Sequence, residues 1–273
     1  MAETCFQSPE KASWPADEPW HSVFRALTLP RSAPTEEPAA PVLERARPLA
    51  RAFEGSHLMT YQWDASGPQV LLVHGWESQS GHWHRWIDAL LQAGYRVTAM
   101  DLPAHGRSGG HSTTVVQAGR AVLEIGRQLG PLHSVIGHSM GSAASLYAFA
   151  HGLRATTSVH IAGPASLVGV IESAAALAGL SVEDLAGLKA AFEAKAQAPL
   201  DSMELDALSV GFDHPALLLH DPEDKEIPIA DAHALLARWE AGRLCEIHEV
   251  GHRRILRSDL AIASALSFLQ GSD

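Results

Sequence analysis

The chain of 273 residues has only two cysteines and no long uninterrupted apolar run. Cys5 and Cys245 lie near opposite ends, and such sparse cysteine favours a reducing compartment over a disulfide framework. The most membrane-like stretch, residues 161–180, is broken by Gly163 and Pro164, so it predicts a strand end and a helix instead of a membrane span. The first residues carry acids and prolines where a secretory leader needs a basic and then an apolar region. We therefore expect a cytoplasmic protein.

Positive charge is also scarce. Lys and Arg number 20 against 31 Asp and Glu, which gives a formal net charge of −11. Without a basic surface to neutralise phosphates, neither nucleic acid nor an anionic membrane is expected as a partner. The composition of 46% hydrophobic and 19% charged residues is that of a packed globular protein. The length suffices for one large domain with a sizeable core.

The first 48 residues are rich in proline and show little periodicity, which predicts an extended arm in place of a folded domain. Within this arm, residues 23–31 (VFRALTLPR) suggest a short anchoring strand. Three aromatic residues, Trp14, Trp20 and Phe24, are candidates to pin the arm to an apolar surface.

Beyond the arm, short apolar runs alternate with stretches whose apolar residues recur at spacings of three and four. This alternation predicts a parallel sheet covered by helices on both faces. Residues 165–211 break the rhythm, because they are rich in alanine and longer than one crossover helix requires. We therefore expect one α/β domain over residues 49–273 with a small helical cap inserted at about 165–211. The runs are HLMTYQW, QVLLVHG, RVTAMDL, HSVIGHS, TSVHIAG, PALLLHD and RLCEIHE.

A G-x-S-x-G motif, GHSMG at residues 137–141, stands between the apolar run HSVIG and a helix that begins SAASLY. At such a strand-to-helix turn the serine takes strained backbone angles, its hydroxyl is exposed, and the glycines let strand and helix approach closely. The motif alone is also compatible with a glycine-rich turn capped by serine. Its position between strand and helix favours Ser139 as a nucleophile.

From about Leu58 to the C-terminus the chain resembles the α/β-hydrolase superfamily. QVLLVHGWESQSGHW is similar to the family's first oxyanion loop and assigns one donor to the N–H of Trp76. DLPAHGRS is similar to the family's Asp-x-Pro-Gly-His-Gly-x-Ser loop, with Ala104 in place of glycine. HDPEDKEIP resembles the acid loop and selects Asp224, and VGH after the last run selects His252. The resemblance implies an α/β-hydrolase fold, with a mostly parallel central sheet flanked by helices and a short helical cap after the sixth strand.

The resemblance also implies a chemistry, since Ser139, Asp224 and His252 follow in the order that this fold uses. A serine hydroxyl is a weak nucleophile at neutral pH, so His252 would accept its proton while Asp224 orients the imidazole. The N–H groups of Trp76 and Met140 would bind the oxyanion. We therefore expect a serine hydrolase without cofactor or metal. It would cleave a carboxylic ester or similar acyl bond of a small molecule through an acyl-enzyme.

Several residues compete for these roles. Asp221 lies three residues before Asp224 and is the alternative acid, but the motif alignment prefers Asp224. His248 is the alternative base, but a base belongs on a loop at the carboxyl end of a strand, which favours His252. The densest histidines, His82 and His84, are two residues apart and point to different faces of a helix, so no metal site is predicted.

Other functions with the same residues stay open. The alternatives are a C–C bond hydrolase or another acyl-transfer enzyme of this fold, and a ligand-binding relative without catalysis. Serine at the elbow argues against the family's haloalkane dehalogenases and epoxide hydrolases, which use aspartate there. Arg253 and Arg254 either pair with acids or recognise a substrate carboxylate. Candidate pocket residues are His138, Glu77, Leu167, Val168 and Ile171.

Overall fold

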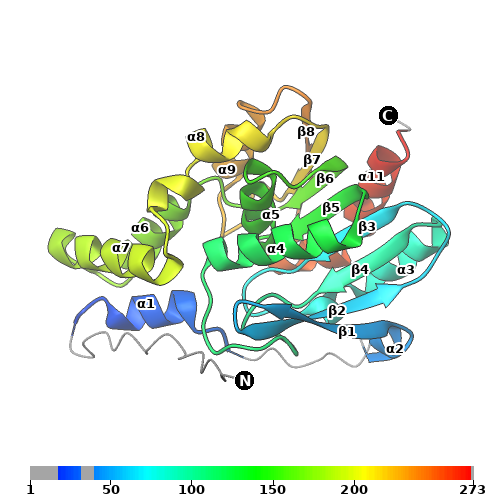
Figure 1. Cartoon of the computed structure of the whole chain (residues 1–273). Coiled ribbons are helices and arrows are strands. Elements are labelled where there is room, and N and C mark those ends of the chain that lie inside the picture. Colours follow the sequence, from blue (N-terminus) through cyan, green and yellow to red (C-terminus); the bar gives the residue numbers. More distant parts are fainter. Residues whose placement is uncertain (1–17, 32–39, 272–273) are drawn as a thin grey trace, which may run out of the picture.

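The computed structural model describes residues 18–31 and 40–271, built around one twisted sheet (Figure 1). The strand order is β1-β2-β4-β3-β5-β6-β7-β8. Strand β2 pairs antiparallel with β1 and β4, and all the other pairs are parallel. This mostly parallel sheet confirms the predicted fold class. The strands are β1 (Arg47–Phe53), β2 (Ser56–Trp63), β3 (Gln69–Val73), β4 (Arg96–Met100), β5 (Leu132–His138), β6 (Ala155–Ile161), β7 (Ala216–His220) and β8 (Gly242–Glu246).

Helices cover both faces of the sheet, which explains why the central runs are apolar throughout. In β3 every residue is buried. Val70 and Leu72 pack on the face covered by α3 and α11, whereas Leu71 and Val73 pack on the face covered by α4 and α5. The helices are α1 (His21–Thr28), α2 (Ala40–Glu44), α3 (His84–Gln92), α4 (Val115–Leu129), α5 (Met140–Ala150), α6 (Leu167–Leu177), α7 (Val182–Ala196), α8 (Leu205–Leu208), α9 (Ile229–Leu236), α10 (Gly251–Arg254) and α11 (Asp259–Leu269).

The connection from β6 to β7 forms the predicted cap. It contains α6, α7 and α8, which project from one end of the sheet in Figure 1. Helix α7 begins at a capping box, in which the Ser181 hydroxyl accepts from the N–H of Asp184 and the Asp184 carboxylate accepts from the N–H of Ser181. The cap insertion after the sixth strand is therefore confirmed.

The prediction of a strand at residues 23–31 is wrong, because most of this segment belongs to helix α1. Trp20, Val23, Phe24 and Leu27 recur at spacings of three and four, and a helix places them on one face. That face packs on the cap, which residues 23–31 alone do not reveal. Trp14 and Cys5 lie outside the described residues. The domain division at residue 48 stays a prediction, although β1 already begins at Arg47.

Within residues 18–31 and 40–271, no helix combines the length and the apolar character that crossing a bilayer would demand.

Candidate active site

The predicted site residues meet at one edge of the sheet. Trp76 follows β3, Ser139 follows β5, Asp224 lies on the loop after β7, and His252 lies in the short helix α10 after β8. These strands are parallel, so their carboxyl ends meet at one edge, where open α/β sheets place ligands. Residues far apart in sequence thus face a common space.

Ser139 stands on a strained turn between β5 and α5. Its φ of 53° lies in a region that residues other than glycine rarely adopt. The Ser139 N–H donates to the Ile161 carbonyl over 2.9 Å, which ties the turn to the end of β6. A Cβ on Gly141 would lie 2.2 Å from the Val73 carbonyl oxygen, so only glycine lets α5 approach β3 this closely. The turn has the geometry expected of a nucleophile elbow.

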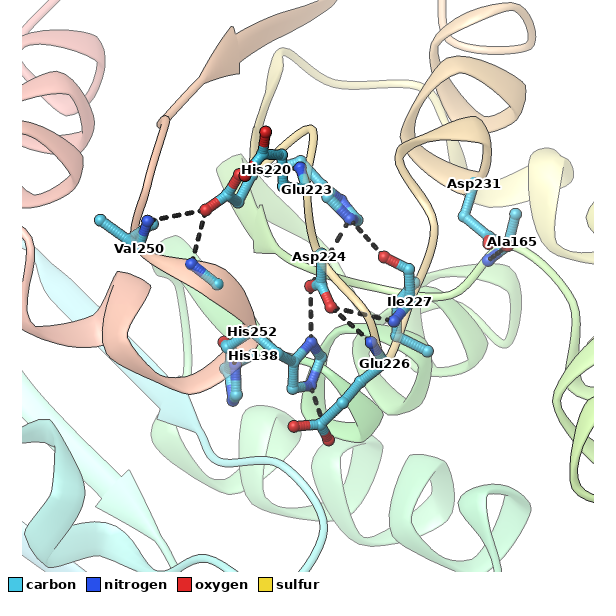
Figure 2. Close-up of polar contacts among 12 residues, drawn as sticks. His138, Ala165, His220, Glu223, Asp224, Glu226, Ile227, Asp231, Val250 and His252 are labelled. Atoms are coloured by element: carbon cyan, nitrogen blue, oxygen red, sulfur yellow. Dashed lines mark hydrogen bonds and ion pairs between the residues drawn. The ribbon is translucent and has the colours of Figure 1, made fainter. Parts of the chain in front are cut away.

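His252 and Asp224 form a buried pair (Figure 2). Nδ1 of His252 lies 2.7 Å from Oδ2 of Asp224, whose side chain is fully buried. The other carboxylate oxygen accepts from the N–H groups of Glu226 and Ile227 over 2.8 and 3.1 Å. Burial alone would raise the Asp224 pKa, but these hydrogen bonds and the charge of His252 together lower it. An ionised Asp224 fixes the proton of the imidazole on Nδ1 and leaves Nε2 as a proton acceptor.

Asp221, the alternative acid, binds backbone and not the imidazole. Its Oδ2 accepts from the N–H groups of Val250 and Gly251 over 2.7 and 2.5 Å, and its Oδ1 accepts from Glu223. Although burial acts to raise the Asp221 pKa, the backbone hydrogen bonds outweigh it and lower the pKa. Asp221 therefore holds the start of α10, the short helix that carries His252, while Asp224 contacts the ring.

We predict a pH-dependent stability effect for Asp221→Asn. Because the folded pKa of Asp221 lies below its unfolded value, its contribution is complete above about pH 4 and is lost as the pH falls through the folded pKa. The variant should therefore unfold at lower urea than the unmodified chain near pH 7, and this gap should narrow near about pH 3. The urea midpoints of the variant and of the unmodified chain, determined at both pH values, measure this difference. A difference that widens on acidification contradicts the prediction.

Two buried histidines fix the peptide planes on either side of Trp76. The Leu102 N–H donates to Nε2 of His74, so Nδ1 of His74 carries the proton and donates to the Gly75 carbonyl over 2.7 Å. The Glu77 N–H donates to Nε2 of His105 over 3.1 Å. Burial lowers the pKa of both histidines, which keeps them neutral and able to accept. Both contacts restrain the direction of the Trp76 N–H.

His138, expected beside the nucleophile, is buried against His252. Its Nε2 donates to the His252 carbonyl over 2.9 Å, and the two rings lie 4.9 Å apart between centroids. Burial, reinforced by the proximity of His252, lowers the His138 pKa to about 3. A neutral His138 therefore supports the His252 backbone without adding charge to the site.

Two cavities meet at Ser139, His252, Trp76 and Glu226. The first, of about 280 Å³, is lined by charged and polar residues that include Glu77, His138, Arg253, Arg254 and Arg257. The second, of about 240 Å³, is apolar and runs beneath the cap. Among the predicted cap residues, Leu167 and Ile171 line this second cavity. Val168 lines neither of these two cavities; it packs against the hydrophobic cluster that α1 forms with α6 and α7.

Glu226 was missed by the sequence reasoning. It lines both cavities, and its Oε2 lies 3.9 Å from Nε2 of His252 (Figure 2). Its other oxygen lies 3.5 Å from Nε of Arg253. The sequence offered one indication of this contact: Glu226 lies two residues after Asp224 on the acid loop, from where its side chain can reach the same imidazole.

Comparison with known proteins gives one family and several partial relatives. A family model for the alpha/beta hydrolase fold matches residues 68–209, just over half of the chain. Epoxide hydrolase B of Mycobacterium tuberculosis is 36% identical over 116 residues, which are 40% of this chain and 32% of that protein. A non-heme haloperoxidase of Rhodococcus erythropolis is 32% identical over 109 residues, 38% of this chain and 39% of that protein. The chain thus spans about a third to two fifths of the length of these relatives.

Solved structures extend the likeness to nearly the whole chain. An esterase of Pyrococcus furiosus superposes with a TM-score of 0.68 at 20% identity, covering 90% of this chain and 98% of that one. At this identity the likeness shows the fold alone, which is the predicted α/β-hydrolase fold.

Proposed function

The chain belongs to the α/β-hydrolase family, and on that premise we propose that it is a serine hydrolase that cleaves a carboxylic ester. The observation that carries the proposal is the His252–Asp224 pair, at 2.7 Å, beside a serine held at a φ of 53°. Ser139 and His252 line the same two cavities, so a bound carbonyl can reach both. This is the arrangement that acyl transfer through a covalent intermediate requires.

The proposed reaction has two halves. Ser139 Oγ attacks the ester carbonyl while Nε2 of His252 takes its proton, and Asp224 stabilises the resulting imidazolium. The N–H groups of Trp76 and Met140 hold the oxyanion. Met140 is the first residue of α5, where N–H groups have no partner within the helix. His252 then gives its proton to the leaving alcohol, and water cleaves the acyl-enzyme by the same route.

The cavities suggest how the substrate lies. An apolar acyl chain fits the cavity beneath the cap, where Leu167, Ile171 and Phe192 supply apolar walls. The leaving group would lie in the first cavity, toward Arg253. Substrates with a small or medium acyl chain are therefore favoured.

We do not infer epoxide hydrolysis from the partial similarity to Epoxide hydrolase B. The family's epoxide hydrolases use aspartate at the elbow, and this chain has Ser139 there. A serine adduct with an opened epoxide would be an ether, which water does not cleave by the route that frees an ester.

Labelling with a fluorophosphonate tests the proposal. We expect one adduct per chain by intact mass, its absence in Ser139→Ala, and turnover of p-nitrophenyl esters that peaks at short or medium acyl chains. The matched control is Ser142→Ala, since Ser142 is buried on α5 three residues later and its hydroxyl contacts His160 instead. No adduct and no turnover would favour the non-catalytic relative. An adduct with turnover of vinylogous diketones but not of esters would favour the C–C hydrolase.

A further inference from the structure

Helix α1, near the start of the described chain, lies beside the cap (Figure 1). Helix α1 lies along cap helix α7, and Trp20, Val23 and Phe24 bury their side chains against Leu188 and Phe192 of that helix. The rings of Phe24 and Phe192 meet edge to face at 5.3 Å between centroids. These contacts make α1 part of the cap, although about 160 residues separate the two in sequence.

The end of α1 reaches the apolar cavity and the body of the protein. Leu27 lines this cavity together with Phe192 of the cap and Met140 of the elbow. One residue later, the Thr28 carbonyl accepts from the N–H of Thr113 over 2.8 Å, just before α4. The packing of α1 on the cap and the hydrogen bond from Thr113 to Thr28 together hold Leu27 in the cavity wall.

Arg31, three residues after Thr28, forms an ion pair with Glu77 of the oxyanion loop. Its Nε and Nη2 each donate to the Glu77 carboxylate over 2.8 Å, and its backbone N–H donates to the same carboxylate over 3.2 Å. Arg31 is 87% exposed but the Glu77 side chain only 14%. Hydrogen bonds from Arg31 outweigh the opposing effect of burial and lower the Glu77 pKa, so the acid stays charged.

Glu77 needs such a restraint. Its φ of 50° is one that non-glycine residues rarely adopt, and its own N–H is the group that donates to His105. The peptide between Trp76 and Glu77 is therefore held from two sides. Trp76, one residue before, is the proposed oxyanion donor, and a backbone donor acts only when it lies within about 3 Å of the developing charge.

From these contacts we propose that Leu27 and Arg31, which α1 brings to the apolar cavity and to the oxyanion loop, belong to the site. Arg31 and Glu77 are positioning residues that aim the Trp76 N–H, and Leu27 sets the length of acyl chain that the apolar cavity accepts. The proposal rests on the proposed function, since it assigns these residues a role in the same acyl transfer. An exposed ion pair with no such role would contribute little to anything measured.

A double-mutant cycle tests the positioning role. With p-nitrophenyl acetate, which carries a short acyl group, we expect Arg31→Ala and Glu77→Gln each to lower kcat about tenfold, part of what a lost oxyanion donor costs. KM should stay within about twofold, because the contact acts in the transition state. The double variant should lose no more than the worse single one. Arg31→Lys should recover part of kcat.

The matched control is Arg154→Ala. Arg154 is likewise exposed and paired with an acid, Asp213, but it lies just before β6, at the opposite edge of the sheet. It should leave kcat unchanged. If Arg31→Ala matches the unmodified chain in kcat, or if the two single losses add in the double variant, the positioning role is overturned. Failure of the unmodified chain to form the Ser139 adduct would overturn the proposed function as well, so the two failures are distinguishable.

Acyl-chain selectivity tests the proposed role of Leu27. Leu27→Ala should raise the octanoate-to-acetate ratio of kcat/KM about tenfold, and Leu27→Trp should lower it by a similar factor, as expected for a few methylenes in an apolar pocket. Leu29→Ala, two residues on and 37% exposed, is the control and should leave the ratio unchanged. Melting temperatures show whether each variant is folded. An unchanged ratio in both folded Leu27 variants would overturn the role of Leu27.

Discussion

Asp224→Asn is expected to lower kcat about 10⁴-fold while leaving the chain folded. The amide that replaces the carboxylate turns an N–H toward Nδ1 of His252, which stabilises the tautomer protonated on Nε2. That tautomer cannot accept the Ser139 proton. The Glu226 and Ile227 N–H groups keep an oxygen acceptor in the variant, so the loop retains its shape. Steady-state kinetics with a p-nitrophenyl ester and a melting curve measure both expectations.

Asp221→Asn is the matched control for this variant. It makes the same chemical change three residues away, but Asp221 accepts hydrogen bonds from the backbone at the start of α10 and does not contact the His252 ring. We expect a loss in kcat of about tenfold or less, since the start of α10 is loosened while the tautomer of His252 is preserved. If Asp221→Asn proves the more damaging variant, Asp221 is the acid and the assignment must be reversed.

Gly141→Ala is expected to unfold or strongly destabilise the protein, by about 3 kcal/mol. The new methyl group would lie 2.2 and 2.4 Å from the carbonyl oxygens of Val73 and His74, which are backbone atoms of the central strand and the loop that follows it. Neither can move without disturbing the sheet or the oxyanion loop. Urea denaturation measures the loss, and any folded fraction should label slowly with fluorophosphonate.

Gly169→Ala supplies the comparison within a second helix. Gly169 lies in α6, where a Cβ would meet the Ser166 hydroxyl at 3.3 Å and no backbone. Replacing a helical glycine by alanine favours the helix by up to about 1 kcal/mol, so this variant should be neutral or slightly more stable. Equal destabilisation by both substitutions would mean that the close approach at Gly141 is not the cause.

Much of the sheet and the geometry around Ser139 could be predicted from sequence because both depend on local patterns. A buried parallel strand requires an apolar run, and the elbow requires glycines at fixed offsets from Ser139. The acid and the base were predicted from the resemblance of two loops, HDPEDKEIP and VGH, to the acid and histidine loops of the α/β hydrolases. The roles of these residues remain predictions until the variants are measured.

The features missed depend on contacts between distant segments. Helix α1 is stabilised by Leu188 and Phe192 of the cap, so the local sequence around Phe24 did not distinguish a helix from a strand. Likewise, Arg31 binds Glu77 across 46 residues, and no motif connects them. Val168 was expected in the pocket because it belongs to an apolar stripe, but the same stripe also packs the cap against α1.

The pairing of α1 with α7 also has a consequence for biosynthesis. During translation α1 leaves the ribosome before the sheet, yet Leu188 and Phe192 are made only after six strands. At about 5–20 residues per second the apolar face formed by Trp20, Val23 and Phe24 waits on the order of ten seconds for its partner. Over that interval it is a ready target for a chaperone. Slower translation within residues 50–160 should lengthen this exposure and lower the soluble yield.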